Sequence, residues 1–271
     1  MEPIPDLDTP SPARVYDYFL GGSHNFASDR ALAARMQQAM PDIGQIMWAN
    51  RAFLRRAVRA LVELGIRQFV DLGSGIPTVG NVHEIAQQAA PDTVVAYVDI
   101  DPVAVAQSRA ILADNPRTVV LHADLTDPDR VLADPALRGL IDLDRPVAVL
   151  LVGVLHQLAD ASPAEVIGRY RDRMAPGGYL ALSHASSDER PDALALRDTY
   201  NRGYARAAQM TLRSRPEIER LFAGFVLIEP GLVQLPEWRP DWPVDPADDT
   251  RRFSTYCGVG RLDEVVRAAV G

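Results

Sequence analysis

The sequence contains no lysine. Its 271 residues include 28 basic residues, and every one of them is an arginine. The phosphate-binding loop of ATP- and GTP-hydrolysing proteins requires a lysine next to a serine or threonine, and Schiff-base catalysis requires a lysine amine. The sequence therefore excludes P-loop nucleotide hydrolysis and pyridoxal-phosphate chemistry.

Cysteine and long apolar runs are also scarce. The single cysteine, Cys257, excludes a disulfide framework and a cysteine-rich metal site, and it fits a reducing compartment. No apolar run reaches the roughly 18 residues that a membrane span requires. The first residues, M-E-P-I-P-D, lack the basic start and apolar core of a signal peptide. We therefore expect a cytoplasmic protein with no membrane partner.

An excess of positive charge and paired histidines are missing as well. The formal net charge is −8, which argues against a nucleic-acid partner, because phosphate binding needs a basic face. The histidines are scattered and show no metal-ligand spacing; they are His24, His83, His122, His156 and His184. No G-x-S-x-G motif of a hydrolase is present. We expect neither a metal site nor a serine hydrolase.

From residue 67 onward, short apolar runs alternate with helical patterns. Several runs are continuously apolar, which is typical of strands buried on both faces of a parallel sheet. The predicted strands are residues 68–72, 93–98, 118–121, 147–154, 179–183, 225–229 and 255–261. The predicted helices are residues 82–90, 102–115, 127–138, 163–174, 193–208 and 216–221. This order predicts a doubly wound α/β fold with a mostly parallel, seven-stranded sheet.

The segment before residue 67 has a different pattern. Its first 27 residues are rich in turn formers, and helices are predicted at about 28–40 and 44–64. We interpret residues 1–66 as an N-terminal helical extension or lid. Residues 67–271 are interpreted as one structural unit that forms the ligand-binding domain.

Three signals follow the first three predicted strands. Gly73-Ser74-Gly75 lets the main chain approach a ligand closely. Asp99 stands 24 residues after Gly75, where an acid accepts the hydroxyls of a ribose, and Asp124 is placed to bind the amino group of a base. Ligands of open parallel sheets bind at these strand ends, so the three signals together indicate a nucleoside ligand. Asp101 is an alternative to Asp99.

The glycine-rich turn also bears on which nucleoside is bound. In the dinucleotide fingerprint G-x-G-x-x-G the third glycine lies beside the pyrophosphate. Here that position is Thr78, Pro77 interrupts the loop, and Gly80 comes two positions late. This departure disfavours a dinucleotide and favours an adenosine without a diphosphate, such as S-adenosylmethionine.

The same motifs resemble those of a known class of enzymes. V-D-L-G-S-G-I-P-T, A-Y-V-D-I-D-P, H-A-D-L and V-L-L-V-G-V-L-H-Q-L are similar to successive motifs of class I S-adenosylmethionine-dependent methyltransferases. P-S-P-A-R-V-Y-D-Y-F-L-G-G-S-H-N-F-A-S-D-R, N-R-A-F-L-R-R-A-V and E-W-R-P-D resemble an actinobacterial methyltransferase family long catalogued as a domain of unknown function. The resemblance covers nearly the whole chain. It implies a Rossmann-like fold and S-adenosylmethionine as cofactor, but it names no methyl acceptor.

The resemblance implies eight cofactor contacts, which are Gly73, Ser74, Gly75, Asp99, Ile100, Asp124, Leu125 and Gly153. The glycine-rich turn is expected to line the methionine part and the sugar. Asp99 is expected to hold the ribose hydroxyls, with Ile100 against the adenine. Asp124 and Leu125 would bound the adenine, and Gly153 would lie beside the sulfonium.

Candidate acceptor residues lie in two further segments. His156 follows the fourth predicted strand and is a candidate catalytic base or acceptor contact; the alternative is a hydrogen-bonded residue that opens the next helix. The N-terminal motif holds Tyr16, Asp17, His24 and Asn25 around Gly21-Gly22. We interpret these residues as a lid over cofactor and acceptor with a glycine hinge; the alternative is a capped turn that packs on the domain.

The proline-rich loop near the C-terminus contributes two aromatic candidates. Trp238 and Trp242 are positioned to wall an acceptor pocket, and the alternative is a loop that covers one end of the sheet. The sequence as a whole predicts an S-adenosylmethionine-dependent methyltransferase that acts on a small molecule. The alternatives are an NAD(P)-linked oxidoreductase and a non-catalytic regulator that binds S-adenosylmethionine.

Overall fold

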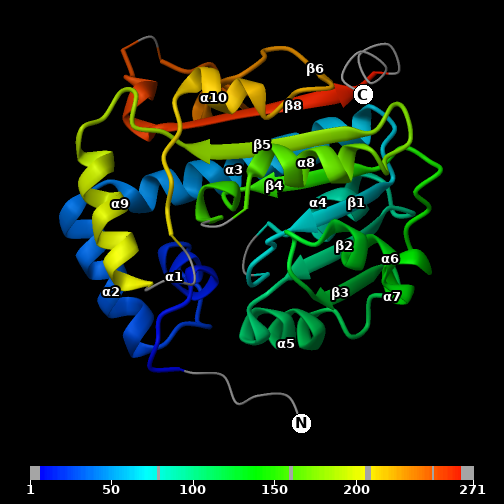
Figure 1. Cartoon of the computed structure of the whole chain (residues 1–271), viewed down its shortest axis with the longest axis horizontal. Helices are drawn as coiled ribbons and strands as arrows, with labels where there is room; N and C mark the ends of the chain where they lie inside the picture. The colour runs from blue at the N-terminus through cyan, green and yellow to red at the C-terminus, as the bar shows by residue number, and fades with distance from the viewer. Residues whose placement is uncertain (1–6, 78–79, 159–160, 205–208, 246, 264–271) are drawn as a thin grey trace.

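The structure is a computed structural model that describes residues 7–77, 80–158, 161–204, 209–245 and 247–263. A central twisted sheet has helices on both faces, and a group of helices lies beyond one end of the strands (Figure 1). The α-helices are α1 (Pro12–Phe19), α2 (Ala27–Ala39), α3 (Ile43–Glu63), α4 (Val82–Ala89), α5 (Pro102–Ile111), α6 (Pro128–Ala133), α7 (Pro135–Arg138), α8 (Pro163–Arg171), α9 (Asp192–Gly203) and α10 (Arg215–Arg220). Three short 3-10 helices are η1 (Leu155–Gln157), η2 (Leu235–Glu237) and η3 (Thr250–Phe253).

The sheet has the strand order β3-β2-β1-β4-β5-β8-β6, and β7 pairs with β8 off this path. The strands are β1 (Gln68–Leu72), β2 (Val94–Asp99), β3 (Thr118–His122), β4 (Ala148–Val152), β5 (Tyr179–Ala185), β6 (Phe225–Leu227), β7 (Val233–Gln234) and β8 (Thr255–Leu262). The first five strands are parallel, and β8 runs antiparallel to β5 and β6. The structure confirms the predicted α/β class: seven strands form the main path, and two-residue β7 is an eighth within the described residues.

The central strands are buried on both faces, and β4, A-V-L-L-V, is an unbroken apolar run. Every residue of β1 is buried, and β5 is buried from Tyr179 to His184. Helices cover both faces of these strands, so neither face requires polar side chains. The strand order reverses between β1 and β4, and the carboxyl ends of the parallel strands point toward α1, α2 and α9 (Figure 1).

The N-terminal helices share a core with the sheet. One buried cluster includes Leu32 and Met36 of α2, Phe53 of α3, Phe69 of β1 and Cys257 of β8. The 21-residue helix α3 packs against α4 and against the ends of β4, β5 and β8. Residues 1–66 and the sheet therefore fold around common apolar contacts, and the predicted division at residue 67 stays a prediction.

Several element boundaries differ from those expected. Residues 12–19, predicted as turns, form α1, because Pro12 stands at its first position, where the missing N–H costs nothing. β4 stops at Val152, because Gly153 takes a φ of 74°. α9 ends at Gly203, and residues 205–208 of its predicted extension lie outside the described residues, as does Thr78.

A buried ion pair anchors α1 on α2. Nε of Arg14 lies 3.0 Å from Oδ2 of Asp29, and both side chains are almost completely buried. Asp29 also accepts the backbone N–H of Phe26 and of Ser11. Removing one partner would leave the other charge buried without compensation, so this pair fixes the position of α1. Within the described ranges, every helix is too short or too polar to cross a membrane.

Candidate functional site

A cavity of about 700 Å³, the first cavity, opens at the carboxyl ends of β1, β2 and β4. It lies where the strand order reverses, which is where open α/β sheets bind ligands. The eight residues predicted to contact the cofactor all line it; they are Gly73, Ser74, Gly75, Asp99, Ile100, Asp124, Leu125 and Gly153.

The turn after β1 brings main chain to the wall of the first cavity. Gly73 and Gly75 have φ angles of 70° and 65°, a conformation that favours glycine. A Cβ atom on Gly73 would lie 2.4 Å from Cγ2 of Val154, whereas one on Gly75 would meet nothing within 4 Å. Gly73 is therefore required for packing, and Gly75 leaves its side of the cavity open to a ligand.

The carboxylate of Asp99 joins the two loops that frame the first cavity. Its Oδ2 accepts the backbone N–H of Gly75 at 2.7 Å, and its Oδ1 accepts that of Asp101 at 2.8 Å. Burial raises the pKa of Asp99 from 3.8 to about 6, although these two N–H groups favour the charged form. Each carboxylate oxygen retains a second lone pair, so Asp99 can accept ribose hydroxyls as well.

Asp101, the alternative ribose ligand, has other partners. Its Oδ1 accepts the backbone N–H groups of Val103 at 2.8 Å and Ala104 at 3.3 Å, which makes Asp101 the N-cap of α5. Its Oδ2 accepts the hydroxyl of Ser11 at the start of α1. The geometry therefore favours Asp99 for the ribose.

The end of the first cavity near β3 combines apolar surface with an acceptor oxygen. Ile100 lines this end and is 63% exposed, while Leu125 is buried beside it. Asp124 accepts the N–H and the hydroxyl of Thr126 through Oδ1, both at 2.8 Å. Within the described residues its Oδ2 has no hydrogen bond. A flat base can lie against Ile100 and donate an amino hydrogen to Asp124.

The N-terminus of α4 is not arranged for a pyrophosphate. A dinucleotide site needs free backbone N–H groups at the helix that follows the glycine-rich turn. Here the N–H of Asn81 donates to Oε2 of Glu84, and the N–H of His83 donates to the hydroxyl of Tyr97, both at 2.9 Å. The side chain of Asn81 caps the N–H of Glu84. The chain's own side chains occupy the first turn, so the geometry disfavours NAD(P).

Three charged residues that line the described part of the first cavity were not predicted as site residues: Arg14 of α1, which pairs with Asp29, Arg51 of α3 and Asp71 of β1. Burial raises the pKa of Asp71 from 3.8 to about 7, and the charge of Arg51 partly offsets this rise. Nε of Arg51 is buried without a hydrogen bond among the described residues. Its guanidinium carbon lies 5.5 Å from the centre of the Tyr16 ring. The pair of Arg51 and Asp71 is complementary to the carboxylate and ammonium of an amino-acid moiety.

Arg51 and Asp71 stand in motifs already quoted for the resemblance, N-R-A-F-L-R-R-A-V and V-D-L-G-S-G. Asp71 lies two residues before Gly73-Ser74-Gly75, and this position in the sequence could have indicated that it lines the site. No sequence pattern places the helix that carries Arg51 next to the end of β1, because that contact is made by tertiary packing.

A second cavity of about 80 Å³ adjoins the first. The two share five wall residues, which are Pro12, Tyr16, Asn50, Gly153 and Gln157. Nδ2 of Asn50 donates to the hydroxyl of Tyr16 at 3.1 Å, and Oδ1 of Asn50 accepts the hydroxyl of Ser183 at 2.6 Å. A Cβ on Gly153 would lie 2.8 Å from Nδ2 of Asn50. Glycine at this position therefore lets α3 close against the end of β4.

His156 lines the second cavity and is absent from the lining of the first. Its Nδ1 is shielded from solvent and has no hydrogen-bond partner in the described chain. Burial, with a smaller effect from the charge of Arg213, lowers the pKa of His156 from 6.5 to about 4. At neutral pH its imidazole is therefore uncharged, with a lone pair available to a ligand.

A second histidine supports the ring of His156. The two ring centres of His156 and His184 lie 5.7 Å apart, edge to face. Arg213 donates to Nε2 of His184 at 2.7 Å, and Nδ1 of His184 lies 2.8 Å from the carbonyl oxygen of Ala185. Because arginine has no acceptor, His184 is assigned as the Nδ1–H tautomer, which donates to Ala185. Burial lowers the pKa of His184 from 6.5 to about 3.

The predicted lid residues divide into two groups. Tyr16 lines both cavities. Asp17 is buried, and its Oδ2 accepts the backbone N–H of His24 and Nδ2 of Asn25, both at 2.9 Å. Asp17, His24 and Asn25 are absent from the linings of the two cavities and form a hydrogen-bonded turn, which matches the capped-turn alternative. Their contact with an acceptor stays a prediction.

The two tryptophans of the proline-rich loop lie away from both cavities. Trp238 is fully buried in the core, edge to face with Phe53 at 5.5 Å between ring centres. Its carbonyl accepts Nε of Arg56 at 2.8 Å. Trp242 is 83% exposed and lines a separate open surface groove. Neither tryptophan therefore walls the first or the second cavity, and the alternative, a loop that covers one end of the sheet, stays a prediction. Among the described residues, no group of three or more acidic, histidine or cysteine side chains converges to hold a metal ion.

Comparison with known proteins identifies the family of this chain. The chain belongs to the S-adenosyl methyltransferase family, which matches residues 2–263. A crystal structure from Thermobifida fusca YX, described as a candidate methyltransferase, has a TM-score of 0.90 and 43% identity over 95% of this chain and 97% of its own. A DUF574-family protein from Streptomyces avermitilis MA-4680 has a TM-score of 0.88 and 37% identity over 94% of this chain and 98% of its own.

A curated relative from Mycobacterium marinum carries the provisional name of an S-adenosyl-L-methionine-dependent methyltransferase. It is 29% identical over 172 residues, which are 62% of this chain and 51% of that protein. The chain thus spans about half the length of this relative. The family confirms the predictions of a class I methyltransferase fold and of S-adenosylmethionine as cofactor.

Proposed function

We propose that the protein transfers the methyl group of S-adenosylmethionine to a small molecule held in the second cavity. The observation that carries this proposal is the contact between the two cavities through Tyr16, Asn50 and Gly153. The first cavity offers acceptor oxygens for an adenosine and a charge pair for a methionine. The second offers an adjoining space with an unpartnered imidazole nitrogen. A regulator that only bound the cofactor would not need this adjoining space.

The charges of the first cavity support S-adenosylmethionine rather than a diphosphate. Among the described residues, four carboxylates line it, from Asp71, Asp99, Asp101 and Asp124, together with two arginines. One of these, Arg14, is already paired with Asp29. An excess of negative charge repels a pyrophosphate and attracts a sulfonium cation. We assign the carboxylate of the methionine moiety to Arg51 and its ammonium to Asp71.

Positioning is the main task of this chain in methyl transfer. S-adenosylmethionine supplies an electrophilic methyl group, and displacement leaves the electron pair of the broken C–S bond on sulfur as S-adenosylhomocysteine. Gly153 keeps the shared wall thin, so that the acceptor atom can approach the methyl carbon in line with the sulfur. Tyr16 and Asn50 hold the other side of this passage through their hydrogen bond.

His156 is the candidate group for a proton released by the acceptor. When an O–H or N–H acceptor forms its bond to the methyl carbon, the proton passes to Nδ1 of His156. The positive charge that leaves the sulfonium is then replaced by the imidazolium, so the net charge of the site does not change. This role requires the tautomer of His156 that carries its hydrogen on Nε2.

Calorimetry with two ligands tests the cofactor assignment. We expect S-adenosylhomocysteine to bind and NAD⁺ not to bind. Arg51→Gln should weaken the binding of S-adenosylhomocysteine by tenfold or more, since a hydrogen bond to a charged group contributes about 1.5–3 kcal/mol. Arg55→Gln is the matched control on the same helix, because Arg55 pairs with Asp241 at the surface. Tight binding of NAD⁺ without S-adenosylhomocysteine would refute the proposal.

Isotope transfer tests the reaction itself. The protein is incubated with S-adenosylmethionine that carries a trideuterated methyl group and with a small-molecule extract of Streptomyces avermitilis, which holds a relative of this chain. We expect the label in a small molecule by mass spectrometry. His156→Asn should slow this transfer and leave the binding of S-adenosylhomocysteine unchanged. Cofactor binding without any labelled product would favour the non-catalytic regulator instead.

A further inference from the structure

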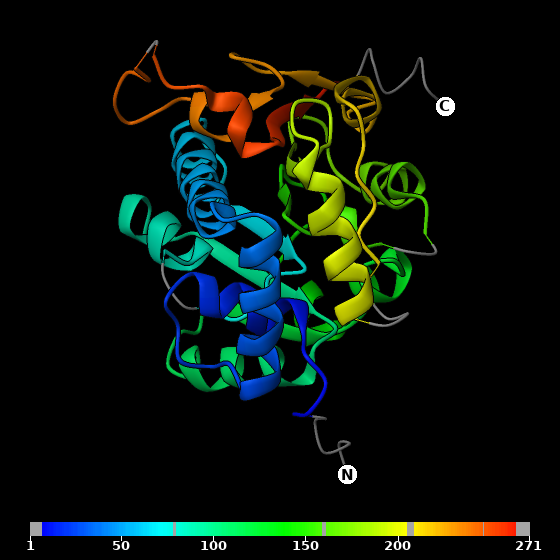
Figure 2. The same cartoon turned by 90° about the vertical axis from the view of Figure 1, so that its left-hand side faces the viewer.

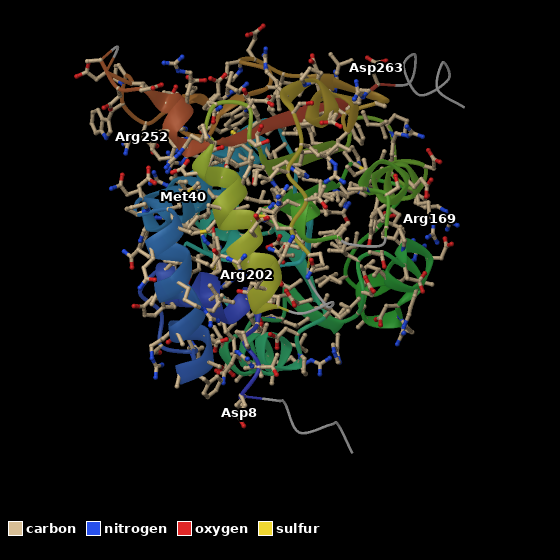
Figure 3. The ribbon with its side chains drawn as sticks, turned by 60° about the vertical axis from the view of Figure 1, so that its left-hand side comes forward. Asp8, Met40, Arg169, Arg202, Arg252 and Asp263 are labelled. Carbon is tan, nitrogen blue, oxygen red and sulfur yellow. The ribbon has the colours of Figure 1, made fainter. Side chains whose placement is uncertain are left out.

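The second cavity is walled by segments from both ends of the chain. α1, α2 and α3 contribute one side, and α9 with the ends of β5 and β8 contributes the other. Figure 2 shows α2 and α9 beside each other in front of the strand ends, in blue and yellow, and the two helices are in contact. Figure 3 labels Met40 where these helices meet. Of these segments, α9 and the ends of β5 and β8 lie outside the motifs that were quoted for the resemblance.

The wall of the second cavity is apolar and carries no charge. In the described part of the chain it contains no aspartate, glutamate or arginine. The imidazole of His156 is neutral, because burial lowers its pKa to about 4. A charged ligand placed here would lose its hydration without gaining an opposite charge. The cavity therefore selects an uncharged ligand.

Methionine dominates the apolar surface. Four of the six methionines in the sequence line the second cavity, which are Met36, Met40, Met47 and Met210. The cavity measures about 80 Å³, whereas a cavity of roughly 150 Å³ holds a benzene molecule. Methionine side chains adapt to ligands of different shape, because they are unbranched and flexible. A compact ligand fits once one or two of them turn.

Two tyrosine hydroxyls in the second cavity can donate hydrogen bonds to a ligand. Tyr200 and Tyr204 of the α9 region are almost fully buried, and their ring centres lie 4.3 Å apart. Neither hydroxyl has a hydrogen-bond partner among the described residues, and both side chains line the second cavity. Burial raises the pKa of both phenols, so they remain hydrogen-bond donors. A buried donor without a partner is costly, and a ligand oxygen would satisfy it.

We propose that the second cavity binds a compact, uncharged, mostly apolar acceptor that carries an oxygen able to accept hydrogen bonds from Tyr200 and Tyr204. This inference rests on the proposed function, because the cavity is the acceptor pocket only if the first cavity holds the cofactor. It narrows the acceptor to small neutral compounds that carry, besides the atom to be methylated, a carbonyl, ether or hydroxyl oxygen. The uncharged wall that the described residues form disfavours charged metabolites.

Methyl-resolved NMR tests the inference with four ligands that share one five-membered carbon ring. The protein carries ¹³C-methyl methionine and is first saturated with S-adenosylhomocysteine. It is then titrated with cyclopentanone, methylcyclopentane, cyclopentanecarboxylate or cyclopentylammonium. We expect cyclopentanone to shift the signals of the cavity methionines and to leave that of Met174, which is buried in the other core cluster. The two ions should cause no shift, and methylcyclopentane should bind several-fold more weakly than cyclopentanone.

Tyr200→Phe combined with Tyr204→Phe separates the two parts of the inference. This variant should reduce the affinity for cyclopentanone several-fold, to the level of methylcyclopentane, and should leave methylcyclopentane binding unchanged. Its Tm should be equal to or higher than that of the parent, because no structural hydrogen bond is lost. Binding of an ion as tight as cyclopentanone, shifts confined to Met174, or no shifts at all would overturn the inference. Failure to bind S-adenosylhomocysteine in the first step would instead count against the proposed function.

Discussion

The two cavities of this protein are built on opposite principles. The first is lined by glycines with positive φ and by four carboxylates, two of which have pKa values raised by burial. The second is lined by methionines and other apolar side chains from helices at both ends of the chain. The first site therefore stores unfavourable charge and backbone conformations that a ligand can relieve. Among the described residues, the second cavity holds no charged side chain, and what a ligand can relieve there is the unpartnered hydroxyls of Tyr200 and Tyr204.

The largest expected effect concerns the buried carboxylate of Asp71 in the first cavity and the free energy of unfolding. The pKa of Asp71 is 3.8 unfolded and about 7 folded. Well below pH 4 both states hold the proton, and as the pH rises toward 7 only the unfolded state releases it, so Asp71 destabilises the fold increasingly. Asp71→Asn should raise the free energy of unfolding at pH 8 by about 4 kcal/mol, at 1.36 kcal/mol per pKa unit, and should weaken S-adenosylhomocysteine.

Denaturant unfolding at pH 4 and pH 8 measures this difference. The gain from Asp71→Asn should fall to about 0.6 kcal/mol at pH 4, where the folded carboxyl is protonated and the unfolded one is close to its pKa of 3.8. The Tyr200→Phe variant in the second cavity should show no such dependence on pH. An equal gain at both pH values would mean that Asp71 does not carry buried charge.

The backbone of the first cavity gives the next effect. Gly73→Ala combines a left-handed backbone conformation with a Cβ 2.4 Å from Val154. It should destabilise the protein by about 3 kcal/mol, from strain of about 1–2 kcal/mol and overpacking of about 1–3 kcal/mol. Gly75→Ala is the matched control, since its φ is similar but its Cβ would meet nothing; it should cost only about 1 kcal/mol. Equal losses in denaturant unfolding would contradict the packing role of Gly73.

A smaller effect, on the affinity for S-adenosylhomocysteine, distinguishes Asp99 from Asp101 as the ribose contact. Asp99→Asn should weaken S-adenosylhomocysteine by about 2 kcal/mol, in the range for hydrogen bonds to a charged group. Asp101→Asn should change little, because asparagine is also a good N-cap. Calorimetry should further show wild-type affinity that falls as the pH drops below about 6, since protonation of Asp99 removes an acceptor. A larger loss of affinity from Asp101→Asn than from Asp99→Asn would assign the ribose contact to Asp101.

The smallest effect falls on the wall between the cavities. Tyr16→Phe removes one hydroxyl that accepts from Asn50 and donates to the carbonyl of Met47. It should cost about 1 kcal/mol of stability, the usual net value of a hydrogen bond. Once an acceptor is known, it should lower kcat more than the affinity for S-adenosylhomocysteine, because the passage loses its support. A change in cofactor affinity with unchanged kcat would place Tyr16 in the first cavity alone.

The comparison of the cavities also explains what could be predicted from the sequence. The sequence predicted eight residues that prove to line one cavity, because glycines and acids follow the strand ends at short spacing and the family motifs add Ile100, Leu125 and Gly153; their contact with the cofactor stays a prediction. Arg51 was missed because α3 reaches the end of β1 only through the packed core. Met210 and Tyr200 of the second cavity lie more than 150 positions after Met36, and no local pattern connects them. Trp238 has the composition of a pocket wall, but its apolar surface is more favourably buried in the core.

A hydrogen bond between Ser11 and Asp101 connects the loop of the first cavity to helix α1, which also lines the second cavity. Oδ2 of Asp101 accepts the hydroxyl of Ser11, which precedes α1, and Tyr16 stands on that helix. A cofactor that orders the loop of Asp99 and Asp101 would also order α1. Acceptor affinity should then rise when the cofactor is present, and the cofactor should gain the same factor from the acceptor, as reciprocal linkage demands. The protein would thus sense occupancy of one site at the other.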